Sequence, residues 1–559
     1  MKRIPPRPDI GQLKKQAKEL LALYRRGDPA AMQRFRACLP AARGQDDEGL
    51  AARSLRLHDA QSCVAREYGF PSWADLQLFV LARRALADDP AQALHHWLRL
   101  VYAGDVAGGN DTHRPAVAAR MLAENPALPG DDPYLACAIG DEAALRRATE
   151  RDPGWIHREG GPLHLPPLVA VTHSGLATRP GVRERLRDCA RFLLSAGASP
   201  HQSIGSRWPP ASLEAPSPTE RLSALYGAAG KARDPQLTQL LLEAGADPDD
   251  GESLYHSLEA PACTRLLLEA GARIAGTNAM YRALDLDDVD LLQLLLAHGG
   301  DANEPPLGPP TSDWGSPLLW AIRRRRSLAH VQALLAAGAR ADACTQDGVP
   351  ARTWALRFGR PDVAELLGHA SAGRGPLAAD EAFVAACARG DAASARAIQA
   401  AHPGMIDALG DAQLRLLPEL AEQGCGDAVR AMVACGWPLE IRGGDIDATA
   451  LNHAVFRGDA GLTRFLLEHG ADWRTLHGFG DNACGSLSWA SLNEPVEGGD
   501  WVGCARALCA HGLPPARPDP GGADIVLVGD RRYRFADDVA DALLDAGGPP
   551  GPEVPRARS

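Results

Sequence analysis

A leucine-rich segment that ends in glycine recurs along the chain and constrains the fold more than any other feature. The sequence RFLLEHGADW, residues 464–473, has close copies in FLLSAGASP, LLLEAGADP, LLLEAGARI, LLLAHGGDA and ALLAAGARA. Glycine is favoured directly after a helix because it adopts the left-handed backbone conformation without a steric penalty. The recurrence therefore predicts an array of similar helical units rather than one globular core.

The spacing of these glycines measures the length of one unit. The glycines that end the leucine-rich segments are Gly197, Gly245, Gly271, Gly299, Gly338, Gly436, Gly470 and Gly512. The step from Gly436 to Gly470 is 34 residues, and the 98 residues from Gly338 to Gly436 are close to three such steps. The gap predicts two degenerate units, and WALRFGRPDVAELLGHASA and AFVAACARGDAASARAIQAAHPG lie where they are needed.

One unit carries a more specific pattern. The segment DATALNHAVFRGDAGLTRFLLEHGADW, residues 447–473, resembles a full ankyrin repeat. Thr449 stands where the family's threonine caps the first helix, Leu466 and Gly470 close the second helix, and Asn452 replaces the family's usual histidine. Residues 222–250 and 315–343 match the same template more weakly. The resemblance implies an all-α fold, an ankyrin-type helical solenoid in which helix-turn-helix pairs are joined by β-hairpin or finger loops.

A tetratricopeptide array is the closest alternative, because it also repeats a pair of helices about every 34 residues. Its helices are joined by tight turns, whereas each second helix here runs into a loop rich in Asp, Asn and Gly. These loops favour the ankyrin type. The steps of 26 and 28 residues that lead to Gly271 and Gly299 predict shortened fingers.

The rest of the chain is predicted to flank this array. Residues 1–84 form a small helical module, with one helix that stops near Gly27, another that ends at Gly69, and a third that starts at Trp73 behind a Ser72 cap. The module resembles the helical leader ahead of bacterial ankyrin arrays. Residues 85–130 are a degenerate helical lead-in, and residues 131–519 hold about ten repeats, several degenerate. Residues 520–548 form a capping hairpin and helix, and residues 549–559 a flexible tail.

Composition excludes several classes of partner. The net charge of -11 and the pI near 5.9 argue against a nucleic-acid surface. The run Arg323 to Arg326 is expected to be a solvated turn between two helices. No segment approaches about 18 consecutive apolar residues, and no signal-peptide core is present, so neither a membrane nor export is expected. Twelve cysteines without a CxxC pair indicate buried thiols in a reducing, cytoplasmic setting, and the Arg-rich, Ala-rich composition indicates a bacterial origin.

Catalytic and metal-binding motifs are absent from the sequence. It contains no GxSxG, HExxH, P-loop, GxGxxG after a strand, or EF-hand spacing. The best metal candidates lie in one loop: His477, Asp481, Asn482 and Cys484. Their spacing matches no established site, and polar residues are common in such loops. We therefore expect no enzyme, no cofactor and no metal.

Partner binding is expected on the concave side, where the fingers and inner helices are left open. Two insertions on the finger side, residues 201–221 and 304–315, carry Trp208 and Trp314, and two regular fingers carry Trp437 and Trp473. The candidate partner-binding residues are Trp208, Trp314, Trp437, Trp473, Arg474, Asp247, Asp249, Asp301 and Asn303. For each tryptophan, packing against the neighbouring finger is an equal alternative. The acidic residues are also good turn formers.

The sequence thus predicts a monomeric, non-catalytic adaptor that binds another protein, of unknown identity, through its concave finger face. A ligand-binding or enzymatic module in the N-terminal helical region is the alternative from another class. A deep pocket with convergent ionisable groups in residues 1–130 would favour it. A bacterial effector delivered into another cell is a third reading.

Overall fold

The computed structural model consists of short helices joined in pairs. It describes residues 2, 4–5, 8–39, 42–52, 55, 57–88, 90–109, 113–308, 314–370, 377–519 and 525–546. The chain divides into two units, Met1–Gly300 and Asp301–Ser559, and the division falls inside the predicted repeat array. The boundaries predicted at residues 84, 130 and 519 stay predictions. In the described part of the chain no helix combines the length and the apolar character that crossing a bilayer requires.

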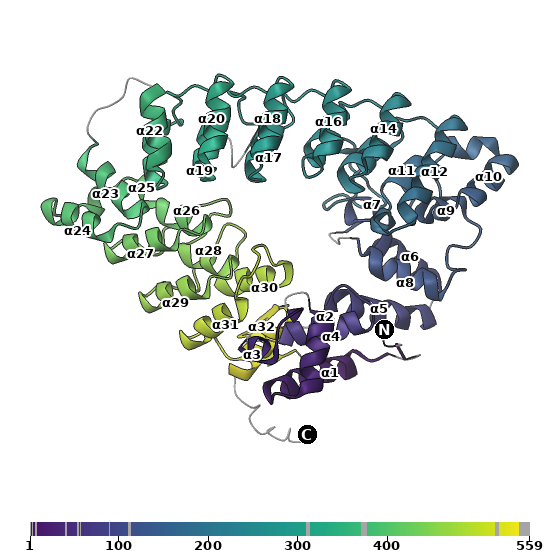
Figure 1. Cartoon of the computed structure of the whole chain (residues 1–559), viewed down its shortest axis with the longest axis horizontal. Helices are drawn as coiled ribbons and strands as arrows, with labels where there is room; N and C mark the ends of the chain where they lie inside the picture. The colour runs from purple at the N-terminus through teal and green to yellow at the C-terminus, as the bar shows by residue number, and fades with distance from the viewer. Residues whose placement is uncertain are drawn as a thin grey trace, which may run out of the picture. The chain divides into compact units, whose positions relative to one another are not determined.

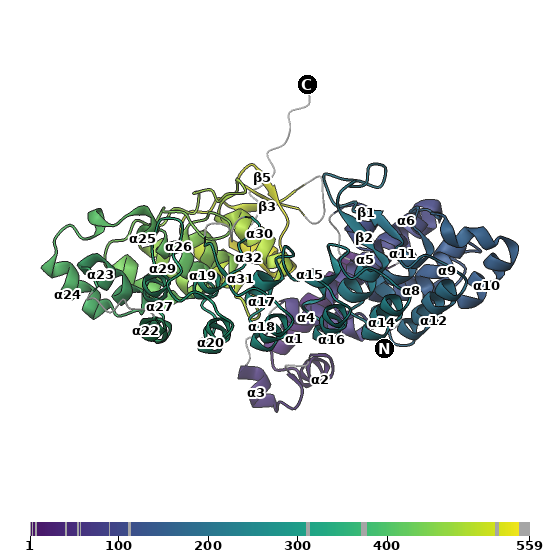
Figure 2. The ribbon, with the colours of Figure 1, turned by 90° about the horizontal axis from the view of Figure 1, so that it is seen from above.

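Within its described residues the first unit contains eighteen α-helices, many of them labelled in Figure 1, and a short hairpin whose strands are labelled in Figure 2. Its α-helices are α1 (Ile10–Arg25), α2 (Pro29–Cys38), α3 (Asp47–Ala52), α4 (Leu57–Glu67), α5 (Trp73–Asp88), α6 (Pro90–Val101), α7 (Gly104–Ala107), α8 (Pro115–Glu124), α9 (Pro133–Ile139), α10 (Glu142–Arg151), α11 (Pro167–Thr172), α12 (Val182–Ser195), α13 (Ala224–Tyr226), α14 (Pro235–Glu243), α15 (Ser253–Ser257), α16 (Pro261–Glu269), α17 (Ala279–Asp285) and α18 (Val289–Ala297). Strands β1 (Ser203–Gly205) and β2 (Arg221–Ser223) pair antiparallel, and the 3-10 helices are Pro153–His157 and Gly175–Thr178. A π-helix, Gly227–Lys231, continues α13.

The second unit continues the pairs and ends in a small sheet. Its α-helices are α19 (Pro317–Arg323), α20 (Leu328–Ala336), α21 (Ala351–Arg357), α22 (Pro361–Ala370), α23 (Ala379–Ala388), α24 (Ala392–Ala401), α25 (Asp411–Leu414), α26 (Leu416–Glu422), α27 (Gly426–Ala434), α28 (Ala450–Phe456), α29 (Ala460–Glu468), α30 (Ala483–Asn493), α31 (Trp501–Ala510) and α32 (Asp537–Ala546), with a 3-10 turn at Ile406–Ala408. Strands β3 (Ala516–Pro518), β4 (Val526–Val528) and β5 (Arg531–Tyr533) form an antiparallel sheet, and β3 packs on α32 (Figure 2).

The predicted helices of the N-terminal module are present. Helix α1 stops at Arg25, two residues before Gly27, which has a φ of 74°. The Ser72 hydroxyl accepts a hydrogen bond from the Asp75 backbone N–H at 3.1 Å and caps α5, which starts at Trp73. The predicted hairpin and closing helix near the C-terminus appear as β4, β5 and α32, whereas β3 was not predicted. The predicted flexible tail lies outside the described residues.

The repeat at α28 and α29 follows the predicted pattern. The Thr449 hydroxyl accepts a hydrogen bond from the Asn452 N–H at 3.3 Å, and the Asp459 carboxylate caps α29 through the Leu462 N–H at 2.8 Å. Asn452, which replaces the family's histidine, donates from its side chain to the Thr475 carbonyl at 3.2 Å and so ties the inner helix to the following finger. The side-chain link at the position of the family's histidine is therefore made by the amide of Asn452.

The glycines that gave the spacing all end outer helices. Each of the eight has a φ between 86° and 100°, in the left-handed region. The two degenerate units predicted between Gly338 and Gly436 form the pairs α21–α22 and α23–α24. The fold is the predicted all-α, ankyrin-type solenoid, and the short units that end at Gly271 and Gly299 keep one helix pair each, α15–α16 and α17–α18.

Successive fingers are linked by a hydrogen bond at a repeated position. The residue four positions after the terminal glycine offers a side-chain oxygen to a backbone N–H of the next finger. Asp249 accepts from the Arg273 N–H at 2.8 Å, Asn303 from the Arg340 N–H at 2.9 Å, and Glu440 from the Asp472 N–H at 2.8 Å. The polar fingers thus hold neighbouring repeats together as well as forming turns.

The basic run at Arg323 to Arg326 lies at the expected turn between α19 and α20, but the expectation that the run is solvated is wrong for Arg323. Arg323 is only 2% exposed and pairs with Asp445 at 2.6 Å, Glu419 at 3.0 Å and Glu422 at 3.5 Å. Burial alone would lower the pKa of Arg323, but the three carboxylates raise it. A buried guanidinium is retained here because several carboxylates from α26 and the finger that follows α27 surround it.

Truncation of Leu466 tests the packing between repeats. The Leu466 side chain is fully buried in α29, so Leu466→Ala should lower the free energy of unfolding by about 2–5 kcal/mol. Urea unfolding of the full chain measures this change. Leu476→Ala, at an exposed finger position, is the matched control and should be near neutral. Equal stability of the two variants would place Leu466 at the surface.

Removal of the buried guanidinium tests the ion cluster. Arg323→Ala leaves Glu419 and Asp445 without their buried partner and should cost about 3–5 kcal/mol. Arg340→Ala removes an exposed pair with Asp342 and should change stability by less than about 1 kcal/mol. Thermal unfolding of both variants provides the comparison, and similar melting temperatures would contradict a structural role for Arg323.

Candidate functional site

The insertion at residues 201–221 builds a hairpin against the lead-in helices. Strands β1 and β2 pair with Ile204 opposite Leu222. Beyond the strands, the Arg207 N–H donates to the Asp105 carbonyl at 2.8 Å, and the Arg207 guanidinium donates to the Val106 carbonyl at 2.7 Å. The inserted hairpin is thereby attached to α7, which carries the side chain of Asp105.

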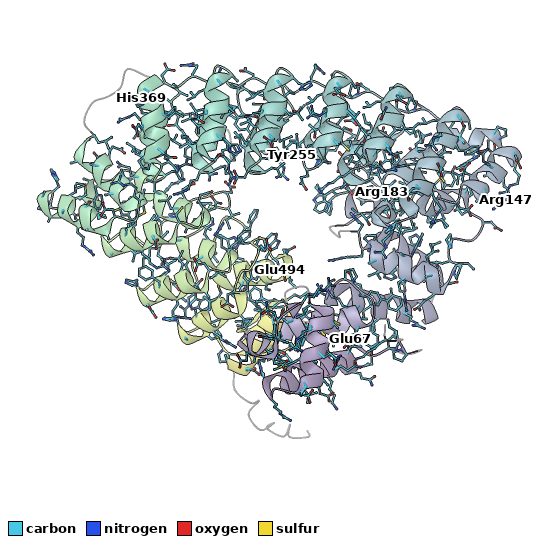
Figure 3. The ribbon with its side chains drawn as sticks, viewed as in Figure 1. Glu67, Arg147, Arg183, Tyr255, His369 and Glu494 are labelled. Atoms are coloured by element: carbon cyan, nitrogen blue, oxygen red, sulfur yellow. The ribbon has the colours of Figure 1, made fainter. Side chains whose placement is uncertain are left out.

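A cavity of about 790 Å³ lies beside this hairpin in the first unit. Its walls come from the lead-in, from the hairpin and from successive repeats, and include His113, Arg183, Trp208, Glu220, Tyr226, Lys231, Glu252 and His256. Figure 3 labels Arg183, at the start of α12, and Tyr255, which neighbours His256 in α15. The lining mixes both signs of charge, and Trp208 is 48% exposed.

Lys231 and Asp105 form an ion pair at the base of the cavity. The Lys231 Nζ lies 2.7 Å from the Asp105 Oδ2 and 5.3 Å from the centroid of the Tyr226 ring. Burial would lower the pKa of Lys231, but Asp105 and Tyr226 raise it. Burial raises the pKa of Tyr226 to about 12. At neutral pH Lys231 is therefore charged and Tyr226 keeps its proton.

Aromatic rings from three successive inner helices line up beside this pair. The Tyr226 ring lies 5.6 Å from the His173 ring and 5.0 Å from the His256 ring. The π-helix Gly227–Lys231 brings the backbone close to α11, and a Cβ at Gly227 would lie 2.4 Å from the Thr172 hydroxyl and 2.5 Å from the His173 Nδ1. Glycine is required here by close approach. Single-turn π-helices are frequent at functional sites.

A second, much smaller chamber adjoins the cavity. Its volume is about 10 Å³, enough for one water, and it shares Asp105, His113 and Lys231 with the larger cavity. His173 also lines it and is 5% exposed. Burial lowers the pKa of His173 to about 4, so the imidazole is neutral at pH 7.

Two buried polar atoms at this chamber lack a hydrogen bond among the described residues, the His173 Nε2 and the Asp105 Oδ1. The His173 Nδ1 lies 3.2 Å from both the Val169 carbonyl and the Thr172 hydroxyl. In one tautomer Nδ1 donates to the carbonyl and Nε2 is an acceptor, and in the other Nδ1 accepts from the hydroxyl and Nε2 is a donor. The chamber therefore contains polar atoms that a water-sized group can satisfy.

Of the four predicted tryptophans, Trp208 is the exposed one and lies at the cavity. Trp314, Trp437 and Trp473 are buried. Trp314 packs against Trp354 at 4.6 Å between ring centroids. These three tryptophans pack against other residues of the array, which was the alternative to partner binding given for each of them.

The other two buried indoles have aromatic, backbone or cationic neighbours in the second unit. Trp437 stacks on Phe383 at 5.7 Å and donates from its Nε1 to the Leu414 carbonyl at 3.0 Å. Trp473 is covered by the guanidinium of Arg474, which lies 4.4 Å from the ring. Arg474 itself is exposed and pairs with Asp472 at 3.2 Å. A role of these residues in partner binding stays a prediction.

The predicted acidic and amide residues serve the fingers. Asp247 and Asp301 are exposed, and each accepts a backbone N–H two residues later, from Asp249 at 2.9 Å and Asn303 at 2.8 Å. Asp249 and Asn303 make the links to the next finger described above. Asp249 also pairs with the Arg273 side chain at 2.6 Å.

The loop considered for a metal has other roles. The Asp481 carboxylate accepts from Arg531 at 2.8 Å, the Asn482 side chain caps α30, and the Cys484 thiol is buried. Within the described residues, potential metal ligands gather instead at Cys38, Cys63 and Glu67, whose ligand atoms lie within 4.8 Å of one another. The sequence shows no spacing that would reveal this group.

The Glu67 carboxylate of that group is already paired. It accepts from Arg34 at 2.6 and 2.8 Å and from Lys2 at 2.7 Å. Two cations on the carboxylate oppose a metal ion there. The cavity is the better candidate, although sequence reasoning missed Asp105, His173 and Lys231.

Comparison with known proteins adds little detail. No family model matches the chain, and no curated protein matches it. Solved structures do match. One is the crystal structure of the ankyrin repeat domain of Bcl-3, described as a unique member of the IkappaB protein family. It is 23% identical, with a TM-score of 0.34, and the match covers 43% of this chain and 99% of that chain.

The buried neutral histidine predicts a loss of stability in acid. The pKa of His173 is about 4 in the folded state, below its ordinary value of about 6.5, so the unfolded state binds the proton more tightly. His173 therefore does not reduce the free energy of unfolding above pH ~6.5. As the pH falls from ~6.5 to ~4, the free energy of unfolding decreases by about 3 kcal/mol. Urea unfolding at several pH values should show a shallower dependence for His173→Phe. An unchanged dependence, matching a His298→Phe control, would contradict a buried neutral His173.

Proposed function

We propose that the protein is a non-catalytic helical-repeat adaptor that holds a segment of another protein in the cavity of its first unit. The observation that carries the proposal is the cavity of about 790 Å³ bordered by an inserted hairpin, with Trp208 48% exposed at its wall. Exposed tryptophan beside a cavity is typical of an interface anchor. The proposal includes a bacterial, cytoplasmic protein that acts as a monomer.

The charges support a protein segment over nucleic acid. Lys231 pairs with Asp105, and Arg233 pairs with Glu259 at 2.5 Å. No continuous basic surface is left for phosphates in this cavity, because Glu220 and Glu252 also line it. A peptide, which carries amides, apolar groups and both signs of charge, suits such a lining.

The ionisation of the cavity supports binding over turnover. General acid–base catalysis near pH 7 is most effective when the group's pKa is close to that pH. The pKa of His173 is lowered to about 4 by burial, and that of Tyr226 is raised to about 12. Neither group is suited to exchange a proton with a substrate at neutral pH.

The alternative of a ligand site in residues 1–130 has one observation in its favour. Asp105 and His113 belong to that segment and line the cavity. The remaining walls come from the hairpin and the repeats, so the site belongs to the lead-in and the array together. We therefore assign the binding role to the array side of the first unit.

Crosslinking in the source cell tests the proposal. A photoreactive amino acid at Glu214, an exposed position of the inserted hairpin, should capture a protein partner, and Trp208→Ala should weaken binding of the purified partner by about tenfold or more. Titration of the partner into each variant provides the measurement.

Trp489→Ala is the matched control, because Trp489 is similarly exposed but belongs to α30 of the second unit, where it stacks on Phe456 at 5.2 Å. Binding that survives Trp208→Ala but is lost in Trp489→Ala would place the partner on the second unit and contradict the proposed site.

A further inference from the structure

Two cysteine thiols lie together where α2 contacts α4 in the first unit. The Cys38 Sγ, the Cys63 Sγ and a carboxylate oxygen of Glu67 all lie within 4.8 Å of one another. Cys38 is the last residue of α2, Cys63 belongs to α4, and both thiols are free. The two sulfurs are therefore neighbours because two helices pack together.

An ion pair holds the same two helices beside the thiols. Arg34 precedes Cys38 by one turn of α2, and Glu67 follows Cys63 by one turn of α4. The Arg34 guanidinium donates to both oxygens of the Glu67 carboxylate, at 2.6 and 2.8 Å, and such a bidentate pair fixes the geometry between its partners. The Cys63 Sγ lies 3.5 Å from the Arg34 carbonyl oxygen, over the last turns of α2. The thiols thus face each other across a braced contact.

The two thiols differ in their access to solvent. Cys38 is partly exposed, whereas Cys63 is fully buried. Burial, together with the neighbouring Cys38 and Glu67, raises the pKa of the Cys63 thiol. A buried thiol is inert toward dissolved oxidants, but it can still react with an oxidised sulfur that lies beside it. Cys38 is therefore the sulfur that an oxidant reaches first, and Cys63 is placed to react with the product.

The charges around the thiols oppose a metal ion. The Glu67 carboxylate accepts from Lys2 at 2.7 Å as well as from Arg34. A metal ion at the three ligand atoms would lie beside two cations. The chemistry left to two adjacent thiols is the formation of a disulfide.

We propose that Cys38 and Cys63 form a reversible disulfide that joins α2 to α4 when hydrogen peroxide reaches the protein. In the first step the Cys38 sulfur attacks the peroxide, the O–O bond breaks, and Cys38 becomes a sulfenic acid while its thiol proton leaves with the other oxygen as water. In the second step the Cys63 sulfur attacks the Cys38 sulfur and the S–O bond breaks. The Cys63 proton leaves with the hydroxyl group as a second water, so the two thiols are oxidised by two electrons and the peroxide is reduced.

A dithiol reverses the reaction. One of its sulfurs attacks the disulfide and breaks the S–S bond, and its second sulfur then displaces the first from the protein. The dithiol becomes a disulfide, and both cysteines regain their protons. Rotation of the two side chains about their Cα–Cβ bonds brings the sulfurs to the bond length of about 2.05 Å.

Peptide mapping of the full-length protein tests the bond. The protein is treated with hydrogen peroxide, blocked with iodoacetamide and digested with trypsin without a reductant. Mass spectrometry should find residues 37–43, ACLPAAR, joined to residues 57–66, LHDAQSCVAR, at a mass two hydrogens below the sum of the two peptides. Dithiothreitol should separate them. Absence of the joined peptides while the exposed Cys344 is already oxidised would overturn the proposal.

Single substitutions test the order of the two steps. In Cys63→Ser, dimedone should trap Cys38 as a sulfenic acid, because the second thiol is missing. In Cys38→Ser, the buried Cys63 should react with peroxide at least about tenfold more slowly than Cys38 does in the parent. Cys344→Ser, which removes an exposed cysteine, is the matched control and should form the bond as the parent does.

Melting curves establish that each variant is folded. Cys63→Ala takes the place of Cys63→Ser if the buried hydroxyl unfolds the helices. A Cys63 thiol that oxidises equally fast with and without Cys38 would contradict the proposed order.

Zinc provides the test for a metal site. Zn²⁺ alone is added to the reduced protein before the peroxide, and the joined peptides should still form because Arg34 and Lys2 occupy the Glu67 carboxylate. One equivalent of Zn²⁺ that shields both thiols from peroxide would assign the group to a metal ion and overturn the disulfide.

The bond should also slow the opening of the helices that it joins. Amide hydrogen exchange in α2 and α4 should slow by about tenfold or more after oxidation, because a cross-link removes open conformations of the chain between the cysteines. Exchange in α28 and α29 of the second unit is the internal control and should not change. Equal exchange in α2 and α4 before and after oxidation would show that the two helices are not joined.

Discussion

The left-handed glycine that ends eight of the outer helices is the constraint on which the array depends. It stops the leucine-rich helix and directs the chain into a finger, so the next inner helix can start beside its predecessor. The side-chain oxygen four residues later then binds the backbone of the following finger, as at Asp249, Asn303 and Glu440. Both features act between neighbours only, as expected for a solenoid whose stability is a sum of nearest-neighbour terms.

Large buried side chains add further contacts between repeats to the glycine and finger interactions. In the second unit, Arg323 connects α19 to α26 and to the finger that follows α27, while its guanidinium also lies 5.5 Å from the Trp314 ring. Trp473 has the same kind of neighbour in Arg474. Three of the four tryptophans proposed from the sequence, Trp314, Trp437 and Trp473, and the buried Arg323 thus support the repeats from within.

The sequence predicted the helical array well because its signals are local. A terminal glycine, a threonine cap and a leucine stripe act over a few residues, so even the degenerate pairs α21–α22 and α23–α24 were found by spacing alone. Exposure of a finger residue such as Trp437 depends on what the next repeat presents, and no local signal reports it. The cavity was missed for the same reason, since Asp105, His173 and Lys231 meet only after three elements pack together.

The π-helix at Gly227–Lys231 suggests how such a site can be added to a repeat protein. The π-helix and the elongated finger alter two neighbouring repeats, but the walls of the cavity also include Asp105 and His113 of the lead-in. Grafting the site onto a regular host array would therefore require the lead-in helix α7 together with the consecutive repeats that carry the hairpin and the π-helix.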